Sequence, residues 1–359
     1  MRPRPETESL TNRVHGGCRL CELDRLGLGA DEVIDFSVCS NPYGGPPGLR
    51  SSLRSVALHS YPDPDCTAFR SVLSQNLGVP PERILTGNGS IELLRLVALA
   101  YVRPGDTIVV PQPTFSEYEL SCRLMGAAVA AFPLDEGEVF RIDADRLCAE
   151  VRKLRPRAVF LCNPNNPTGW YLDKREVRAV LDACEDTLLV LDEAYAGFTR
   201  DRWESTELLE HGHLLIIRSM TKDYGLAGLR LGFALGNEGI MGPLRRVQLP
   251  WSVNSLAQAG GIHAVRSGGA HLRKSSFRLA KAKERLIAEL DSIGLSVIRG
   301  DANFFMVKVG DATSLRIRLL RHGVMVRDCT SFGLPAFIRI GVRTPEENQR
   351  LVTALRGVL

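Results

Sequence analysis

Four short apolar runs in the middle of the chain alternate with stretches of helical pattern, and this alternation constrains the fold most strongly. The runs are DTIVVPQP (106–113), RAVFLCNP (157–164), TLLVLDEAY (187–195) and HLLIIRSM (213–220), and the helical stretches are 90–102, 115–126, 143–154 and 174–185. Short apolar runs bounded by turn residues are typical of strands buried on both faces. The pattern therefore predicts an α/β fold in which helices flank a mostly parallel central sheet.

The last hundred residues follow a different pattern, which predicts a second and smaller domain. A helical stretch over roughly 255–293 precedes a mixture of strand-like and helical segments. A chain of 359 residues is also long enough for two domains. We expect a large domain over residues 46–250, followed over 251–359 by a linking helix and a small α+β domain. Residues 1–45 have no sheet-forming series and are expected to pack on the small domain.

The charge composition gives no indication of a nucleic-acid or membrane partner. The 45 basic and 41 acidic side chains leave a net charge of +4, a nearly even balance. The run of about 18 apolar residues that a membrane helix needs is missing. The opening MRPRPETESL also lacks the apolar core of a signal peptide. We therefore expect a cytoplasmic protein.

Nine cysteines in a chain without an export signal are expected to be free thiols. Cys18 and Cys21 form a C-x-x-C pair, which can bind a metal or cycle between redox states. No second C-x-x-C and no H-x₃₋₅-H completes a zinc site. We therefore expect no metal site and a structural or incidental role for the pair.

Polar clusters follow the strand-like runs, where ligands gather in parallel α/β sheets. In LTGNGSIELL (85–94), Gly89 precedes a helix that opens at about Ser90. Free backbone N–H groups at such a helix end form an anion cup, although a plain glycine-rich turn is the alternative. In CNPNNPTGWY (162–171), prolines force a rigid turn that would aim Asn166 into the site.

A third cluster, LLVLDEAYAGF (188–198), places Asp192 directly after four apolar residues. A carboxylate there is costly unless a cation meets it. A protonated ring nitrogen would serve, and so would a nearby arginine. Tyr195, three residues further on, offers a phenol that could bond a ring hydroxyl.

The fourth cluster, IIRSMTKDYGLAGLRLGF (216–233), places Lys222 among small and hydroxyl residues after a strand. Lys222 is either a solvated loop residue or an amine held close to a phosphate or an aldehyde, with which it can form an imine. Ser219 and Thr221 could bind a phosphate, and Arg230 could neutralise it. Together, the four clusters describe a site for pyridoxal 5′-phosphate (PLP).

The motifs NPNNPTG, DEAY and S-x-T-K, with an arginine eight residues after the lysine, resemble the fold-type I, aspartate-aminotransferase-like PLP enzymes. The resemblance covers roughly residues 15–358 and implies a homodimer with shared active sites. It implies Lys222 as the Schiff-base lysine, Asp192 on the pyridine nitrogen, and Tyr195 with Asn166 near the ring hydroxyl. The other implied cofactor contacts are Phe115 stacked on the ring, Gly89, Ser90, Ser219, Thr221 and Arg230 on the phosphate, and Tyr61 lent to the neighbouring subunit's phosphate.

Within this family the chain resembles two kinds of enzyme, the L-threonine-O-3-phosphate decarboxylases of cobalamin biosynthesis and the histidinol-phosphate aminotransferases. HGG (15–17), PWSVN (250–254) and Arg343 in FIRIGVR are similar to the decarboxylases. We therefore expect a PLP-dependent lyase that converts L-threonine O-3-phosphate to (R)-1-amino-2-propanol O-2-phosphate. The alternative is a histidinol-phosphate aminotransferase, or an enzyme for another phosphorylated or phosphonate amino acid.

The resemblance also implies the substrate contacts. Arg339 would grip an α-carboxylate in a bidentate fork, and Arg327 would face a substrate phosphate. Asn166 would lie beside the substrate. His15 would lie over the imine, with a loop histidine as the alternative.

Two positions depart from the decarboxylase pattern. Cys39 and Cys18 stand where those enzymes commonly have asparagine. A thiol is a poor substitute for an amide that bonds a phosphate or a carboxylate. The substrate therefore stays open from the sequence.

Overall fold

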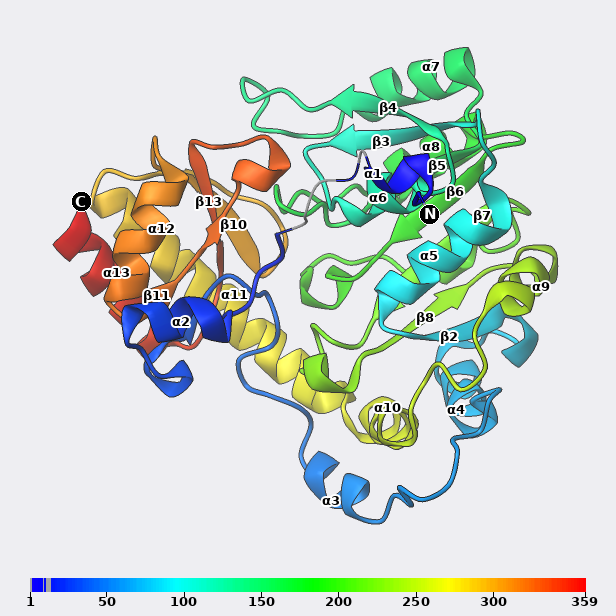
Figure 1. Ribbon diagram of the computed structural model, residues 1–359, viewed down its shortest axis with the longest axis horizontal. Helices are drawn as coiled ribbons and strands as arrows, with labels where there is room; N and C mark the ends of the chain where they lie inside the picture. The colour runs from blue at the N-terminus through cyan, green and yellow to red at the C-terminus, as the bar shows by residue number, and fades with distance from the viewer. Residues whose placement is uncertain (1, 9, 11–13) are drawn as a thin grey trace.

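The computed structural model describes residues 2–8, 10 and 14–359, and a seven-stranded sheet forms its centre (Figure 1). In spatial order the strands are β2 (Ile84–Asn88), β8 (Leu231–Leu235), β7 (Leu214–Ser219), β6 (Leu188–Asp192), β5 (Ala158–Cys162), β3 (Thr107–Gln112) and β4 (Ala128–Pro133). β8 runs antiparallel to β2 and β7, and the remaining neighbours pair in parallel. The predicted α/β fold with a mostly parallel sheet is confirmed, because the four apolar runs form β3, β5, β6 and β7.

Helices cover both faces of this sheet, as strands that are apolar on both sides require. Along β5, Ala158 and Phe160 pack on one face, and Val159 and Leu161 pack on the other. The helices of the first face are α5 (Ser90–Tyr101), α6 (Glu117–Arg123) and α9 (Glu238–Val247), and those of the second are α4 (Thr67–Leu77), α7 (Ala144–Leu154), α8 (Lys174–Ala183) and α10 (Ser255–Ser267). Removal of both apolar faces from water stabilises this arrangement.

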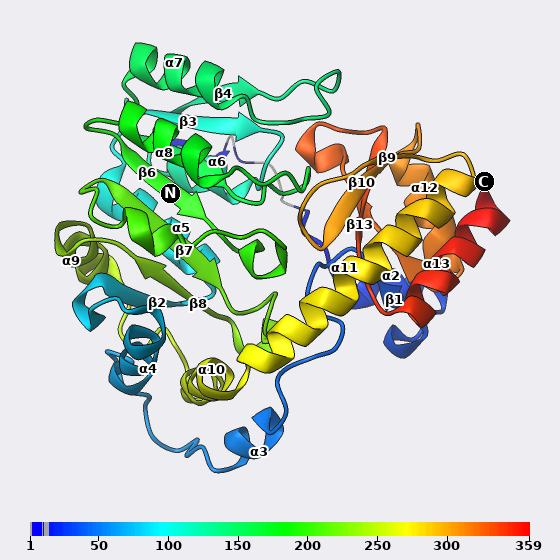
Figure 2. The same cartoon turned by 180° about the vertical axis from the view of Figure 1, so that it is seen from behind.

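A four-stranded antiparallel sheet lies beside the first one. Its order is β12 (Arg327–Asp328), β13 (Phe337–Gly341), β10 (Phe304–Lys308) and β9 (Ser296–Ile298). The helices α11 (Gly269–Ser292), α12 (Ala312–Arg321) and α13 (Pro345–Val358) share its core. Figure 2 shows α11 extending from the end of α10 to this second layer. The division of the chain at residues 45 and 250 stays a prediction.

The N-terminal segment contacts both parts of the molecule. In α2 (Leu20–Leu26), Leu23 packs against Leu320 and Met325, and β1 (Ile34–Asp35) pairs in parallel with β11 (Val324–Met325). Ahead of α1 (Pro5–Glu8), however, the Arg4 guanidinium donates to the carbonyl of Leu124, directly after α6. The segment therefore does not pack on the smaller part alone.

The remaining elements are α3 (Leu49–Arg54) and 3₁₀ turns at Ala30–Glu32, Pro81–Arg83, Ala196–Phe198, Ser205–Leu208, Ala227–Leu229 and Thr330–Phe332.

The helical stretch expected over roughly 255–293 is two helices, and Gly268 separates them. A Cβ atom at Gly268 would lie 2.3 Å from the carbonyl oxygen of Ala264 and 2.8 Å from the ring of Tyr224. No other residue type fits without a shift of its neighbours. The break therefore depends on packing around Tyr224 as well as on the local Gly268–Gly269 pair.

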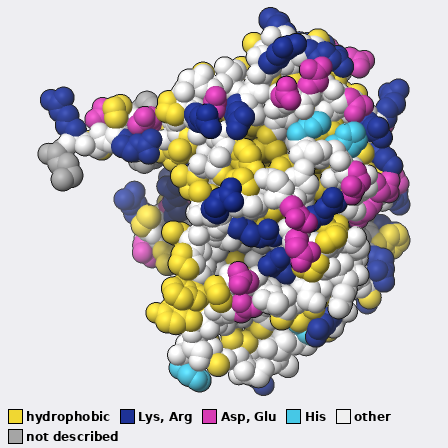
Figure 3. All heavy atoms as spheres, turned by 90° about the vertical axis from the view of Figure 1, so that its right-hand side faces the viewer, with side chains coloured by type: hydrophobic (Ala, Val, Ile, Leu, Met, Phe, Trp, Pro, Cys, Tyr) yellow, Lys and Arg dark blue, Asp and Glu magenta, His cyan; other side chains and the backbone are white. Residues whose placement is uncertain are grey.

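Acidic and basic side chains are intermixed on the face of the molecule shown in Figure 3. All nine cysteines are free thiols, and seven of them are buried. Among the described residues, no three His, Cys, Asp or Glu side chains lie together as a metal site would need. The helices that the structure describes include none with both the length and the apolar character to cross a bilayer.

Candidate active site

A cavity of about 290 Å³ lies beyond the carboxyl ends of β5, β6 and β7. It brings together eleven of the predicted site residues, namely His15, Ser90, Phe115, Asn166, Tyr195, Ser219, Thr221, Lys222, Arg230, Arg327 and Arg339. Three predicted residues do not line it: Gly89 and Asp192 lie behind the wall, and Tyr61 lies on the surface. The sequence analysis missed Ser37, Ile91, Ser116 and Phe332, which also line it.

The anion cup lies where β2 passes into α5. Gly89 has φ 74°, and a Cβ atom there would lie 2.6 Å from Nη2 of Arg230. Glycine therefore lets the Arg230 guanidinium approach the first turn of α5. At the end of β7, the hydroxyls of Ser219 and Thr221 lie 2.7 Å apart, and both residues are buried. A helix N-terminus, an arginine and two hydroxyls are the groups that bind a phosphate monoester.

Asp192, a residue that is 3% exposed, ends β6. Its Oδ2 accepts from the Tyr118 hydroxyl at 2.8 Å, and its Oδ1 accepts from the Ala194 N–H at 2.9 Å. Burial raises the pKa of Asp192 to about 6, although these two hydrogen bonds act in the opposite direction. A buried carboxylate of this kind is suited to a cationic partner such as a protonated ring nitrogen.

Tyr118 is a site residue that the sequence analysis missed. It belongs to α6, three residues after Phe115, and its side chain is fully buried against Phe160. The PTFSEY string contains it, but only the folded chain brings it to Asp192, 74 residues away. Burial next to that carboxylate raises the pKa of Tyr118, so its hydroxyl stays a donor.

Lys222 follows β7 and projects into the cavity, with its Nζ 5.8 Å from the centre of the Tyr195 ring. Burial lowers the pKa of Lys222, and the cations Arg339 and Arg230 act in the same direction. An amine with a lowered pKa is neutral more often near pH 7. It can therefore act as a nucleophile or accept a proton.

Arg339, on β13, places a buried guanidinium in the cavity. It donates from Nη1 to Asn166 Oδ1 and from Nη2 to the Ser37 carbonyl at 2.7 Å. Its Nε is buried without a hydrogen-bond partner, and no carboxylate pairs with its guanidinium among the described residues. An anionic substrate group would satisfy it.

Arg327, on β12, is a second buried guanidinium. Its Nη2 donates to the Val14 carbonyl at 2.5 Å and to Ser331 Oγ at 2.6 Å. Burial and the neighbouring Arg339 lower the pKa of Arg327 to about 10. Within the part of the chain that the structure describes, no carboxylate forms an ion pair with this buried cation, which favours the binding of an anion.

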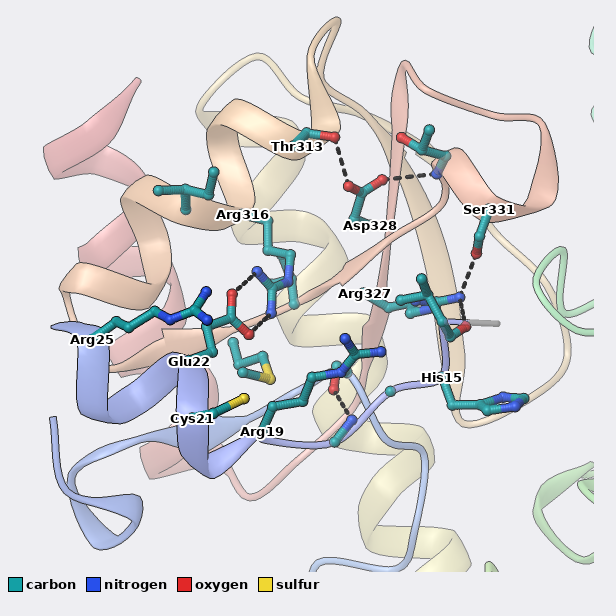
Figure 4. A pocket seen from close by; sticks show the side chains of 18 residues that line it. His15, Arg19, Cys21, Glu22, Arg25, Thr313, Arg316, Arg327, Asp328 and Ser331 are labelled. Carbon is teal, nitrogen blue, oxygen red and sulfur yellow. Dashed lines mark hydrogen bonds and ion pairs between the residues drawn. The ribbon is translucent and has the colours of Figure 1, made fainter. Parts of the chain in front are cut away.

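Arg327 also lines an adjoining cavity of about 550 Å³ (Figure 4). The cavity shares Val14, His15, Gly16, Ser37 and Arg327 with the first one. Arg316 on its far side is already neutralised by a bidentate ion pair with Glu22, at 2.6 and 2.7 Å. The two cavities together leave room for a substrate that extends past His15.

The three cysteines that the sequence analysis singled out lie outside the first cavity. Cys39 is buried in a cluster with Tyr195 and Phe304, and burial raises the pKa of its thiol. Burial and the neighbouring Asp35 raise the pKa of Cys18 to about 11. Cys21 is exposed and borders the adjoining cavity but not the first one. The thiols of Cys39 and Cys18 therefore act as neutral packing groups.

This fold, with a phosphate cup, a buried carboxylate and a lysine with a lowered pKa around one cavity, defines a PLP-dependent enzyme of fold type I. The model of the family "Aminotransferase class I and II" matches residues 32–355. The chain belongs to this family.

Individual relatives agree with the family assignment. A histidinol-phosphate aminotransferase of Symbiobacterium thermophilum is 36% identical over 337 residues, which are 92% of each chain. The structure resembles that of the Sinorhizobium meliloti histidinol-phosphate aminotransferase in complex with PLP, with a TM-score of 0.85, 23% identity and coverage of 100% and 98%. It also resembles the Porphyromonas gingivalis L-threonine-O-3-phosphate decarboxylase, with a TM-score of 0.79, 26% identity and coverage of 90% and 98%.

The expected decarboxylase function is wrong. Curated relatives that are 33–36% identical over most of the chain carry the name histidinol-phosphate aminotransferase. Of the features that favoured a decarboxylase, HGG lines the first cavity through His15 and Gly16, but the other two lie outside it. Arg343 binds the Asp35 carbonyl and Glu347, and Trp251 stacks on Tyr61 at the surface. In this chain Arg343 and Trp251 make packing contacts outside the cavity, so their presence does not indicate which reaction the enzyme catalyses.

Proposed function

We propose that the chain is a PLP-dependent aminotransferase whose amino donor is histidinol phosphate. The observation that carries the proposal is the pair of buried guanidinium groups, Arg327 and Arg339, in the cavity that holds Lys222. Two such cations suit substrates with a strongly anionic group, and the donor carries a phosphate. The names of the curated relatives support the same donor.

The chain's own residues would divide the work in the following way. PLP, when bound, supplies an aldehyde and an electron sink. Ser90, Ser219, Thr221 and Arg230 would hold its phosphate, and Phe115 would pack on its ring. The amine of Lys222, whose pKa burial lowers, would move a proton to and from the substrate carbon. Arg339 and Asn166 would orient the substrate.

A product assay tests this proposal. Purified, PLP-loaded protein is incubated with L-histidinol phosphate and 2-oxoglutarate, and glutamate formation is measured. We expect glutamate to appear only when both substrates are present. Carbon dioxide release from L-threonine O-3-phosphate without an oxo acid, and no glutamate in the first reaction, would contradict the proposal.

Replacement of Arg339 with methionine is expected to lower kcat/KM by about 10²-fold, because the charged hydrogen bonds to the substrate are lost. The methionine keeps an unbranched apolar stem without the guanidinium. Arg343→Met is the matched control, since Arg343 lies four residues further on but contacts Asp35 and Glu347 instead of the cavity. Equal losses in the two variants, measured by steady-state kinetics, would refute the role of Arg339.

We also propose a homodimer, in which Tyr61 contacts the cofactor phosphate of the partner subunit. Tyr61 is 79% exposed and stacks on Trp251 outside its own cavity. Leu58 and Leu249 on the same loops are 77% and 73% exposed. Apolar side chains that are this exposed mark an interaction surface. A cytoplasmic location stays a prediction.

Mixed dimers are expected to recover activity that neither parent has in full. In a mixture of Lys222→Ala and Tyr61→Phe subunits, each hybrid dimer would hold one site with both native residues. About a quarter of the wild-type sites should then return, because half of the dimers are hybrids. A sedimentation mass near 39.5 kDa, that of a single chain, would exclude the dimer.

A further inference from the structure

The carboxylate of Glu117 lies against His15 at the mouth of the cavity. Glu117 belongs to the first turn of α6 and is 3% exposed. Its Oε1 lies 3.1 Å from Nε2 of His15, and its Oε2 accepts from Nη2 of Arg95 on α5, also at 3.1 Å. A buried carboxylate is stable only when it is paired. Arg95 and His15 both supply such partners.

This contact occupies the Nε2 edge of the His15 ring. The ring lies 5.9 Å from the Phe115 ring and is tilted by 51° to it. Because a carboxylate accepts hydrogen bonds, Nε2 carries a proton and Nδ1 is the other available ring nitrogen. His15 itself lines the cavity together with Lys222 and Arg327.

The backbone around His15 is held from the opposite side. Arg327 donates to the carbonyl of Val14, and the N–H of Gly17 donates to Ser37 Oγ at 2.8 Å. Glu117 on α6 thus joins the N-terminal segment to the part of the molecule that holds the seven-stranded sheet. Arg327 on β12 joins the segment to the four-stranded sheet. The His15 side chain is nevertheless 47% exposed, so the Glu117 contact is needed to keep it in one orientation.

We propose that Glu117 is a positioning residue, which with Arg95 holds His15 so that Nδ1 donates to the phosphate of the amino donor. The other charged groups that line the first cavity with His15 are Lys222, Arg230, Arg327 and Arg339, all of which are basic, whereas Glu22 and Asp328 line the adjoining cavity. An imidazolium between the Glu117 carboxylate and a phosphate would make a charge-assisted hydrogen bond on each side. The identity of the phosphate rests on the proposed function, but the orientation of His15 does not.

Kinetics of variants form the first test. Glu117→Met is expected to raise KM for histidinol phosphate about tenfold, with a smaller effect on kcat. Glu117→Gln should recover much of the loss, because its amide oxygen still accepts from Nε2. Adding Glu117→Met to His15→Ala should cause no further loss, since Glu117 would act through His15. An undiminished further loss in the double variant would overturn the proposal.

Glu119→Gln is the matched control. Glu119 lies in the same first turn of α6, but it pairs with Arg123 at 2.6 Å and does not line the cavity. The variant therefore removes one charge from that turn without touching His15. We expect its KM for histidinol phosphate to equal that of the wild type, and a rise as large as that of Glu117→Met would count against a specific role.

Chemical labelling gives a readout that does not depend on turnover. The rate at which diethyl pyrocarbonate modifies His15 is measured by mass spectrometry in the holoenzyme, with the exposed His322 as the internal reference. Loss of the Glu117 contact should free Nε2 and raise the His15 rate relative to His322. Equal relative rates in the wild type and Glu117→Met would overturn the inference. If the proposed transamination is wrong, the wild-type protein would instead form no glutamate from histidinol phosphate and 2-oxoglutarate, whatever the labelling rates are.

Discussion

Replacement of Lys222 with alanine is expected to lower turnover by about 10⁴-fold or more. The structure places its amine alone among arginines and hydroxyls, with a pKa that burial lowers. No other lysine lines the cavity, and this holds for residues 2–8, 10 and 14–359. The variant is also expected to lose the visible absorption band of lysine-bound PLP. Single-turnover kinetics and an absorption spectrum measure both effects.

Lys283→Met is the control for the loss of a buried amine. Lys283 donates to the carbonyls of Gly300 and Ala302, and burial lowers its pKa to about 8. It lies outside the cavity, so the variant should keep the absorption band even if its stability falls. A band that persists in Lys222→Ala, or disappears in Lys283→Met, would contradict the assignment of Lys222.

Replacement of Asp192 with asparagine is expected to lower kcat by about 10²–10³-fold. The amide keeps the shape and can still accept from Tyr118, but it no longer carries the charge that would meet a ring nitrogen. The loss should appear equally with either substrate, because the contact is with the cofactor. A decrease that is confined to KM would instead place Asp192 at the substrate.

The raised pKa of Asp192 also predicts how the stabilisation of the folded protein by PLP depends on pH. Burial raises the pKa of Asp192 from 3.8 to about 6, so the folded, cofactor-free protein binds this proton more tightly than the unfolded chain does. Its contribution to stability is therefore present at low pH and is lost as the pH rises through about 6.

A cationic ring nitrogen offsets that loss only when the carboxylate is ionised. The increase in Tm on adding PLP should therefore be larger at about pH 8 than at about pH 5. Ionisation of PLP itself also changes over this range, so Asp192→Asn serves as the reference. The pH dependence should be weaker in that variant, and an unchanged dependence would show that Asp192 does not face the ring nitrogen.

Much of the large sheet follows from local sequence. The four apolar runs became β3, β5, β6 and β7, because a strand buried on both faces needs apolar residues at every position. β8 was missed because LGFAL (231–235), although apolar throughout, directly follows the polar loop after Lys222. The break at Gly268 was missed because it depends on the distant ring of Tyr224.

The sequence by itself determined which groups stand at the ends of the strands. Asn166, Asp192, Ser219 and Lys222 follow apolar runs directly, and parallel strands carry such residues to one edge of a sheet. That local rule pointed to PLP as the cofactor, which the family assignment confirms. The roles of the individual residues were implied by the resemblance and stay a prediction.

Only the tertiary structure decided which residues reach that edge from elsewhere. It brought Tyr118 to Asp192 and Glu117 to His15 across 74 and 102 residues, and it directed Arg343 away from the cavity. The number of residues between two groups does not determine their distance in the folded chain, and a side chain's direction depends on what packs around it. For this reason the resemblance of short strings led to the wrong reaction, although the same strings identified the fold and the cofactor.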